Sequence, residues 1–277
     1  PNRKNEVSTT GHADFVELPN GDWWSVFLGC RPYGPDLYNL GRETFMMPVE
    51  WKNDWPEIVG GNEPIPMIHK RPNLPLSKEK TEPLNGNFIS KDDFSSNELD
   101  FKWSFIRTPK EKWYELINGK LLIKPRSESI HTESNFSFIG RRQQHLKFEA
   151  SVKLEFNPKN NLEVAGLTAF QNEKHYFLVG KRLNADHKLE VFVERTASKI
   201  NEGKSEIISK KELLDTDEPL LVKIEGNGRL YSFYFKTAEK AEWNLLIKDV
   251  DGSILSTKEA GGFVGTYLGM YASKKHF

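Results

Sequence analysis

Hydrophobic and polar positions alternate along most of this chain with the period of two that is typical of β-strands. Between residues 146 and 156 the apolar positions recur at every second residue, as a strand with one buried face requires. Further strand-like runs lie at 164–170, 175–179, 189–193, 220–224, 230–235, 243–247 and 263–271. Only residues 210–215 suggest a helical turn. Many short strands at regular spacing predict an all-β fold, with a β-sandwich over residues 85–277.

Two Asn-Gly pairs between apolar runs predict β-hairpins. Asn20-Gly21 separates runs at 13–18 and 23–29, and Asn118-Gly119 separates runs at 113–117 and 120–123; this pair is the strongest short-range hairpin signal. With a further run at 44–51, the first sixty residues form two or three antiparallel strands. Such a unit is marginal alone and has an open edge, so we expect self-association or a missing neighbouring segment.

A proline-rich stretch divides the chain. Gly60-Gly61 ends the first unit, and the following residues carry scattered charges and five prolines: Pro64, Pro66, Pro72, Pro75 and Pro83. This composition suits an extended, semi-rigid linker. The sequence therefore predicts three parts: residues 1–60, a linker at 61–84 and a sandwich at 85–277.

Composition limits the classes of binding partner that can be expected for this chain. Lys+Arg and Asp+Glu both number 39, so the zero net charge gives no reason to expect nucleic acid, and no apolar run is long enough to predict a membrane span. The eighteen Phe, eight Tyr and seven Trp suit strands and the faces of sugars. A single cysteine, Cys30, excludes an internal disulfide but leaves the compartment open. We expect a bacterial periplasmic or secreted location and, since the chain starts without Met, a mature or trimmed product.

Two residues near the N-terminus are candidates for chemistry. His12 follows a glycine at the start of a predicted hairpin, but no second ligand stands at a metal-like spacing, so a surface or core histidine is the alternative. Arg42 follows Gly41, which permits close approach of a ligand, and the arginine guanidinium can bind hydroxyls and carboxylates with two hydrogen bonds. The alternative is a simple pairing with Glu43 or with a neighbouring strand. Spacing alone does not decide either case.

Five motifs occur in a fixed order in the first sixty residues: Gly11-His12-Ala13-Asp14-Phe15-Val16-Glu17, Gly21-Asp22-Trp23-Trp24, Gly29-Cys30-Arg31-Pro32, Leu40-Gly41-Arg42-Glu43-Thr44 and Trp51-Lys52-Asn53-Asp54-Trp55-Pro56. As a set they resemble the last propeller blade of glycoside hydrolase family 43, which contains β-xylosidases and α-L-arabinofuranosidases. The downstream part resembles the concanavalin A-like, jelly-roll sandwich of the two-domain members. Its recurring segments match Gln171-Asn172-Glu173-Lys174-His175-Tyr176 and Gly261-Gly262-Phe263-Val264-Gly265.

The resemblance implies the last blade of a five-bladed propeller followed by that sandwich. It also implies an inverting exo-glycosidase with an Asp base, an Asp modulator and a Glu acid, because inversion needs two carboxyl groups with room for a water. The blades that carry these residues would lie upstream of Pro1. No catalytic residue is therefore expected in this chain, which we expect to be inactive by itself.

The resemblance implies a functional role for three residues of this chain. His12 matches a histidine that contributes to a hydrated calcium site. Arg42 matches an arginine that binds substrate hydroxyls. Phe263 matches a residue of a sandwich loop that narrows the central funnel of the propeller to a pocket. The alternative for Phe263 is a core aromatic. The implied substrates are xylo- or arabino-oligosaccharides. The rival hypothesis is a non-catalytic carbohydrate-binding or scaffold sandwich.

Overall fold

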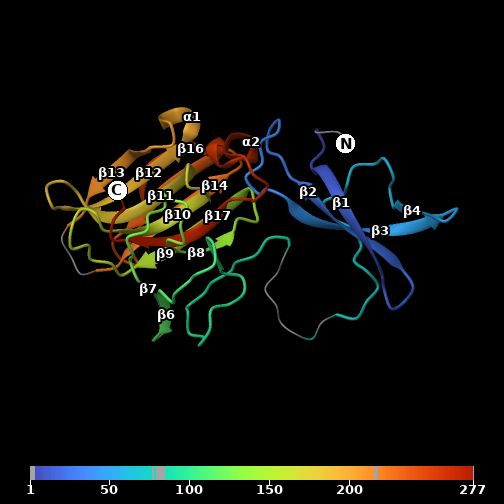
Figure 1. Ribbon diagram of the computed structural model, residues 1–277, viewed down its shortest axis with the longest axis horizontal. Helices are drawn as coiled ribbons and strands as arrows, with labels where there is room; N and C mark the ends of the chain where they lie inside the picture. The colour runs from blue at the N-terminus through green and yellow to red at the C-terminus, as the bar shows by residue number, and fades with distance from the viewer. Residues whose placement is uncertain (1–3, 77, 79–84, 215–217, 277) are drawn as a thin grey trace.

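The structure is a computed structural model that describes residues 4–76, 78, 85–214 and 218–276. Residues 77 and 79–84 of the predicted linker lie outside the described part, as does Phe277. Figure 1 shows a small sheet on one side of the molecule and a two-sheet sandwich on the other.

The small sheet contains four antiparallel strands, so the expectation of two or three strands was wrong. The missed strand follows Asn53 and Asp54, which both have positive φ, at 52° and 61°. Two such residues in succession form the tight turn that folds a strand back on itself. The strands follow the order β1-β2-β3-β4: β1 Ser8–Glu17, β2 Trp23–Cys30, β3 Glu43–Lys52 and β4 Trp55–Ile58.

The sandwich packs a seven-stranded antiparallel sheet, of order β13-β12-β11-β10-β17-β8-β5, against a four-stranded sheet, of order β16-β15-β14-β9. The larger sheet contains β5 Ser104–Phe105, β8 Ser137–Arg142, β10 Val164–Asn172, β11 His175–Leu183, β12 Leu189–Ala197, β13 Ser205–Glu212 and β17 Tyr267–Ser273. The smaller sheet contains β9 Lys147–Leu154, β14 Leu220–Asn227, β15 Leu230–Lys236 and β16 Asn244–Asp251. The predicted all-β architecture is confirmed.

Short elements complete the described fold. The second predicted hairpin forms as β6 Tyr114–Ile117 and β7 Lys120–Ile123. The helices each have four residues: α1 Ser198–Asn201, α2 Thr257–Ala260 and the 3-10 helix η1 Gly252–Leu255. None of the described helices has the length and apolar character needed to cross a membrane.

Alternation along the larger sheet places apolar side chains on both of its faces. Phe177 and Val179 of β11 face the smaller sheet and join its apolar side chains, whereas Tyr176 and Leu178 point to the opposite face. That opposite face is covered by the segment before β8, which contributes Phe136 and other apolar residues. The larger sheet is therefore buried on both sides.

Two sequence-based assignments need correction. The helical turn expected at 210–215 is wrong over the described residues, because Lys210 and Lys211 belong to β13 and pair with Phe192 and Val191 of β12. The strand expected from residue 263 begins only at Tyr267. Gly261 and Gly262 have φ of 77° and 71° and turn the chain into a loop that reaches the small sheet.

Candidate functional site

The small sheet and the sandwich meet where two loops lie side by side, and we call this contact the junction: residues 39–42 on one side and 263–266 on the other. The amide of Thr266 donates to the carbonyl of Asn39 at 2.8 Å, and the amide of Arg42 donates to the carbonyl of Phe263 at 3.3 Å. These backbone hydrogen bonds fix the register of the two loops. The junction therefore places residues 42 and 263 beside each other.

Two glycines permit this close approach. A Cβ on Gly41, whose φ is 64°, would lie 2.4 Å from the backbone nitrogen of Gly265. A Cβ on Gly265 would lie 2.2 Å from the carbonyl oxygen of Leu40. Because backbone atoms cannot move aside as a flexible side chain does, the contact requires glycine at both positions.

Arg142, the last residue of β8, stabilises the junction with hydrogen bonds from the sandwich side. Its Nη2 donates to the carbonyl oxygens of both Leu40 and Arg42. Leu40 is fully buried, so water cannot replace this donor. The sandwich therefore controls the path of the backbone that carries Arg42.

The side chains of Arg42 and Phe263 stack at the surface of the junction. The guanidinium carbon of Arg42 lies 3.7 Å from the centre of the Phe263 ring, within the range of an attractive cation–π contact. Phe263 is 64% exposed, so the alternative of a core aromatic is wrong. The two residues assigned to substrate binding from the sequence thus form one surface, although one lies in a loop of the small sheet and the other in a loop of the sandwich.

Glu43 pairs with Arg31 and not with its neighbour Arg42. The Arg31 guanidinium donates from Nε and Nη2 to the two Glu43 oxygens at 2.8 and 2.7 Å, and also to the carbonyl of Gln144 at 2.8 Å. This bidentate bond raises the pKa of Arg31. The simple ion pair of Arg42 with Glu43 is therefore not observed.

Side chains of the segment 171–176 hold the loop that carries Phe263, a role that sequence reasoning missed. The amide of Gln171 donates from Nε2 to the carbonyl of Val264 at 2.8 Å, and that of Asn172 donates from Nδ2 to the carbonyl of Ala260 at 3.0 Å. The recurring motif was visible in the sequence, but its partners lie about 90 residues further along the chain.

A buried hydrogen-bond network anchors the other loop. Asn39 donates from Nδ2 to the Tyr231 hydroxyl and to the carbonyl of Gly252, both at 3.1 Å. Tyr231 in turn donates to Oε1 of Gln143 at 2.8 Å. Burial raises the pKa of Tyr231 to about 12, so the hydroxyl stays protonated and remains a donor.

Cys30, the last residue of β2, is also buried. Burial raises the pKa of its thiol, which makes the thiol a poor nucleophile.

His12 lies apart from the junction on β1. It is exposed, with φ of 50°, within an irregularity of the β1–β2 pairing between Gly11 and Asp14. Among the described residues, no group of three potential metal ligands includes His12. A single imidazole does not fit the oxygen-rich shell that calcium requires. Calcium binding at His12 stays a prediction.

Two family models match the chain. "Beta xylosidase C-terminal Concanavalin A-like domain" matches residues 91–276, and "Glycosyl hydrolases family 43" matches residues 1–56.

Relatives extend over nearly the whole chain. A non-reducing-end α-L-arabinofuranosidase of Bacteroides ovatus is 35% identical over 95% of this chain and 47% of its own length. A β-xylosidase of Bacillus subtilis is 27% identical over 96% of the chain and 51% of its own length. The crystal structure of a GH43 protein from Bacillus licheniformis superimposes with a TM-score of 0.87 and 28% identity, over 100% of this chain and 52% of that protein. The chain spans about half the length of these relatives.

Proposed function

The chain belongs to glycosyl hydrolase family 43, and on this premise we propose that its protein removes terminal xylosyl or arabinofuranosyl residues from hemicellulose oligosaccharides, with inversion. One observation carries the proposal: Arg42 and the exposed Phe263 stack into one surface at the hydrogen-bonded junction. In this role the Arg42 guanidinium donates to hydroxyls of the terminal sugar, as arginine does with paired oxygens. The Phe263 ring lies against the apolar face of that sugar and limits the site to chain ends.

The catalytic carboxylates, in this proposal, come from outside the 277 residues. Glu43 is the carboxylate next to Arg42 in the sequence, and Arg31 occupies both of its oxygens at 2.7 and 2.8 Å. A general acid must instead carry a proton at working pH and face the leaving oxygen. Relatives such as the B. subtilis β-xylosidase match over only half of their length, which leaves room for those groups elsewhere.

The test uses the complete gene product on 4-nitrophenyl β-xyloside and α-L-arabinofuranoside. We expect turnover of at least one substrate, and no turnover by residues 1–277 alone. Loss of the Arg42 guanidinium in Arg42→Ala removes charged hydrogen bonds worth about 1.5–3 kcal/mol, so kcat/KM should fall about 10- to 150-fold. Phe263→Ala should raise KM, whereas the matched control Phe101→Ala, at a fully exposed position, should not.

Three results would overturn the proposal. Absence of turnover on both substrates would refute the proposed glycosidase activity itself. Activity of residues 1–277 alone would show that the carboxylates lie within this chain. Unchanged kinetics in Arg42→Ala would show that the junction does not bind the sugar.

A further inference from the structure

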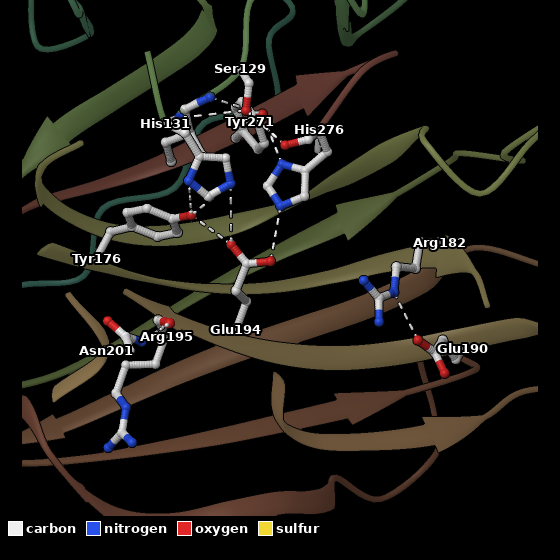
Figure 2. Close-up of polar contacts among 11 residues, drawn as sticks. Ser129, His131, Tyr176, Arg182, Glu190, Glu194, Arg195, Asn201, Tyr271 and His276 are labelled. Atoms are coloured by element: carbon white, nitrogen blue, oxygen red, sulfur yellow. Dashed lines mark hydrogen bonds and ion pairs between the residues drawn. The ribbon is translucent and has the colours of Figure 1, made fainter. Parts of the chain in front are cut away.

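A second polar cluster lies in the sandwich, on the face of the larger sheet that points away from the smaller one. It consists of His131, from the segment that covers this face, Glu194 of β12, and His276, which follows β17. Figure 2 shows both imidazoles and the Tyr176 hydroxyl directed at the Glu194 carboxylate. Nothing in the proposed glycosidase activity uses these residues.

Their donor atoms converge on one point. One nitrogen of each imidazole and one Glu194 oxygen all lie within 4.8 Å of one another. Nε2 of His276 is 3.0 Å from Oε2 of Glu194, and Nε2 of His131 is 3.9 Å from Oε1. Ligand atoms around a tetrahedral zinc ion, with bonds of about 2.0–2.1 Å, lie roughly 3.3 Å apart. The two distances run to different Glu194 oxygens, so a bound ion would draw the three ligand atoms closer together than the 4.8 Å within which they now lie.

We propose that His131, Glu194 and His276 form a zinc site. Two imidazoles and one carboxylate suit zinc, whereas calcium and magnesium prefer oxygen ligands alone. The side chains of Glu194 and His276 are 0% exposed and that of His131 is 25% exposed. An ion therefore enters past His131, where a water completes the fourth position.

Neighbouring hydroxyls orient the ligands, as the surroundings of metal sites commonly do. Tyr176 donates to Oε1 of Glu194 at 2.5 Å, and the Tyr271 oxygen lies 3.1 Å from Nδ1 of His276. The Tyr271 oxygen also accepts from the amide of Ile130 at 3.1 Å, which fixes its position.

A proton occupies the place of the ion when zinc is absent. At 3.0 Å, the contact of His276 Nε2 with Glu194 requires a hydrogen between two otherwise repelling lone pairs. Zinc takes this place, and the imidazole proton moves to Nδ1, where the Tyr271 oxygen accepts it. The ion would then tie the segment before β8, strand β12 and the chain end after β17 together.

The experiment uses the tag-free 277-residue chain, freed of metal with a chelator and titrated with zinc against a chromophoric competitor. We expect one zinc ion per chain, and cobalt substitution should give the intense visible bands of four-coordinate Co²⁺. His131 is partly exposed, so His131→Asn should fold. Its zinc affinity should fall by more than the roughly 10- to 100-fold that loss of an outer-shell partner costs, because a ligand itself is lost. The matched control His187→Asn, on an exposed turn, should bind as the wild type does.

Thermal unfolding separates a metal site from a hydrogen-bonded network. Zinc should raise the Tm of the wild type and of His187→Asn, because an ion that binds only the folded state stabilises it. It should leave the Tm of His131→Asn unchanged. Absence of stoichiometric zinc in the wild type, or equal affinity in His131→Asn, would overturn the proposal.

Discussion

Replacing Gly41 with alanine should break the junction, and the structure allows the cost to be divided into two parts. The first is conformational, because φ at Gly41 is 64° and an L-residue there loses about 1–2 kcal/mol. The second is steric: the new Cβ would meet the backbone N and Cα of Gly265 at 2.4 and 2.8 Å. Forcing atoms into such a contact costs about 1–3 kcal/mol. The free energy of unfolding should therefore fall by about 2–5 kcal/mol.

Other glycines of the chain separate these two parts. Gly261 has φ of 77° with no atom near its Cβ position, so Gly261→Ala tests the conformational part alone. Gly265→Ala tests the steric part, because its Cβ would lie 2.2 Å from the Leu40 oxygen without a positive φ. Gly11 has neither problem and should tolerate alanine.

Urea unfolding of the four variants measures these costs, and hydrogen exchange locates them. Gly41→Ala should lose the most stability and Gly11→Ala none, with the other two between them. Exchange should accelerate in peptides that contain residues 39–42 and 263–266. If Gly41→Ala proved no less stable than Gly261→Ala, the close packing of the two loops would be refuted.

Three further predictions concern the groups that surround the junction. Tyr231→Phe removes a buried hydroxyl from Asn39 and Gln143, so the free energy of unfolding in urea should fall by about 1–3 kcal/mol. Arg142→Gln removes the guanidinium that donates to the carbonyls of Leu40 and Arg42, so hydrogen exchange should accelerate in the 39–42 loop while β10 and β11 keep their protection. Burial lowers the pKa of His175 below its ordinary value near 6.5; the unfolded chain then takes up the proton more readily, and stability is lost as pH falls below about 6.5. The Tm of the wild type should consequently drop more between pH 7 and 5 than that of His175→Gln, and equal drops would contradict the assignment.

The strands were predictable where one face of a strand is buried, because alternation then appears in the sequence. This holds for β9, whose exposed and half-buried residues alternate without exception. It fails for β8, in which Phe138 and Ile139 are both fully buried because the larger sheet is covered on both faces. It also fails for β13, an edge strand whose lysines resemble those of a solvated helix.

The site was predictable only as separate residues. Arg42 and Phe263 each matched a family motif, but no local pattern indicates that one lies over the ring of the other. Their contact depends on Gly41 and Gly265, on Arg142 and on two backbone hydrogen bonds between segments far apart in the sequence. The cluster of His131, Glu194 and His276 was missed for the same reason, since its members share no spacing.

The junction also determines what the sandwich contributes. A loop such as 39–42 would be mobile if it were held only by the small sheet, because few buried contacts would oppose its motion. Here Arg142 binds its carbonyls, and Gln171 and Asn172 hold the facing loop. In the proposed function none of these three side chains needs to touch the sugar, because Arg142 acts through the backbone of Arg42. Gln171 and Asn172 act through the carbonyls of Val264 and Ala260, in the loop that carries Phe263. The sandwich is therefore part of the proposed sugar-binding wall, and not an appendage to it.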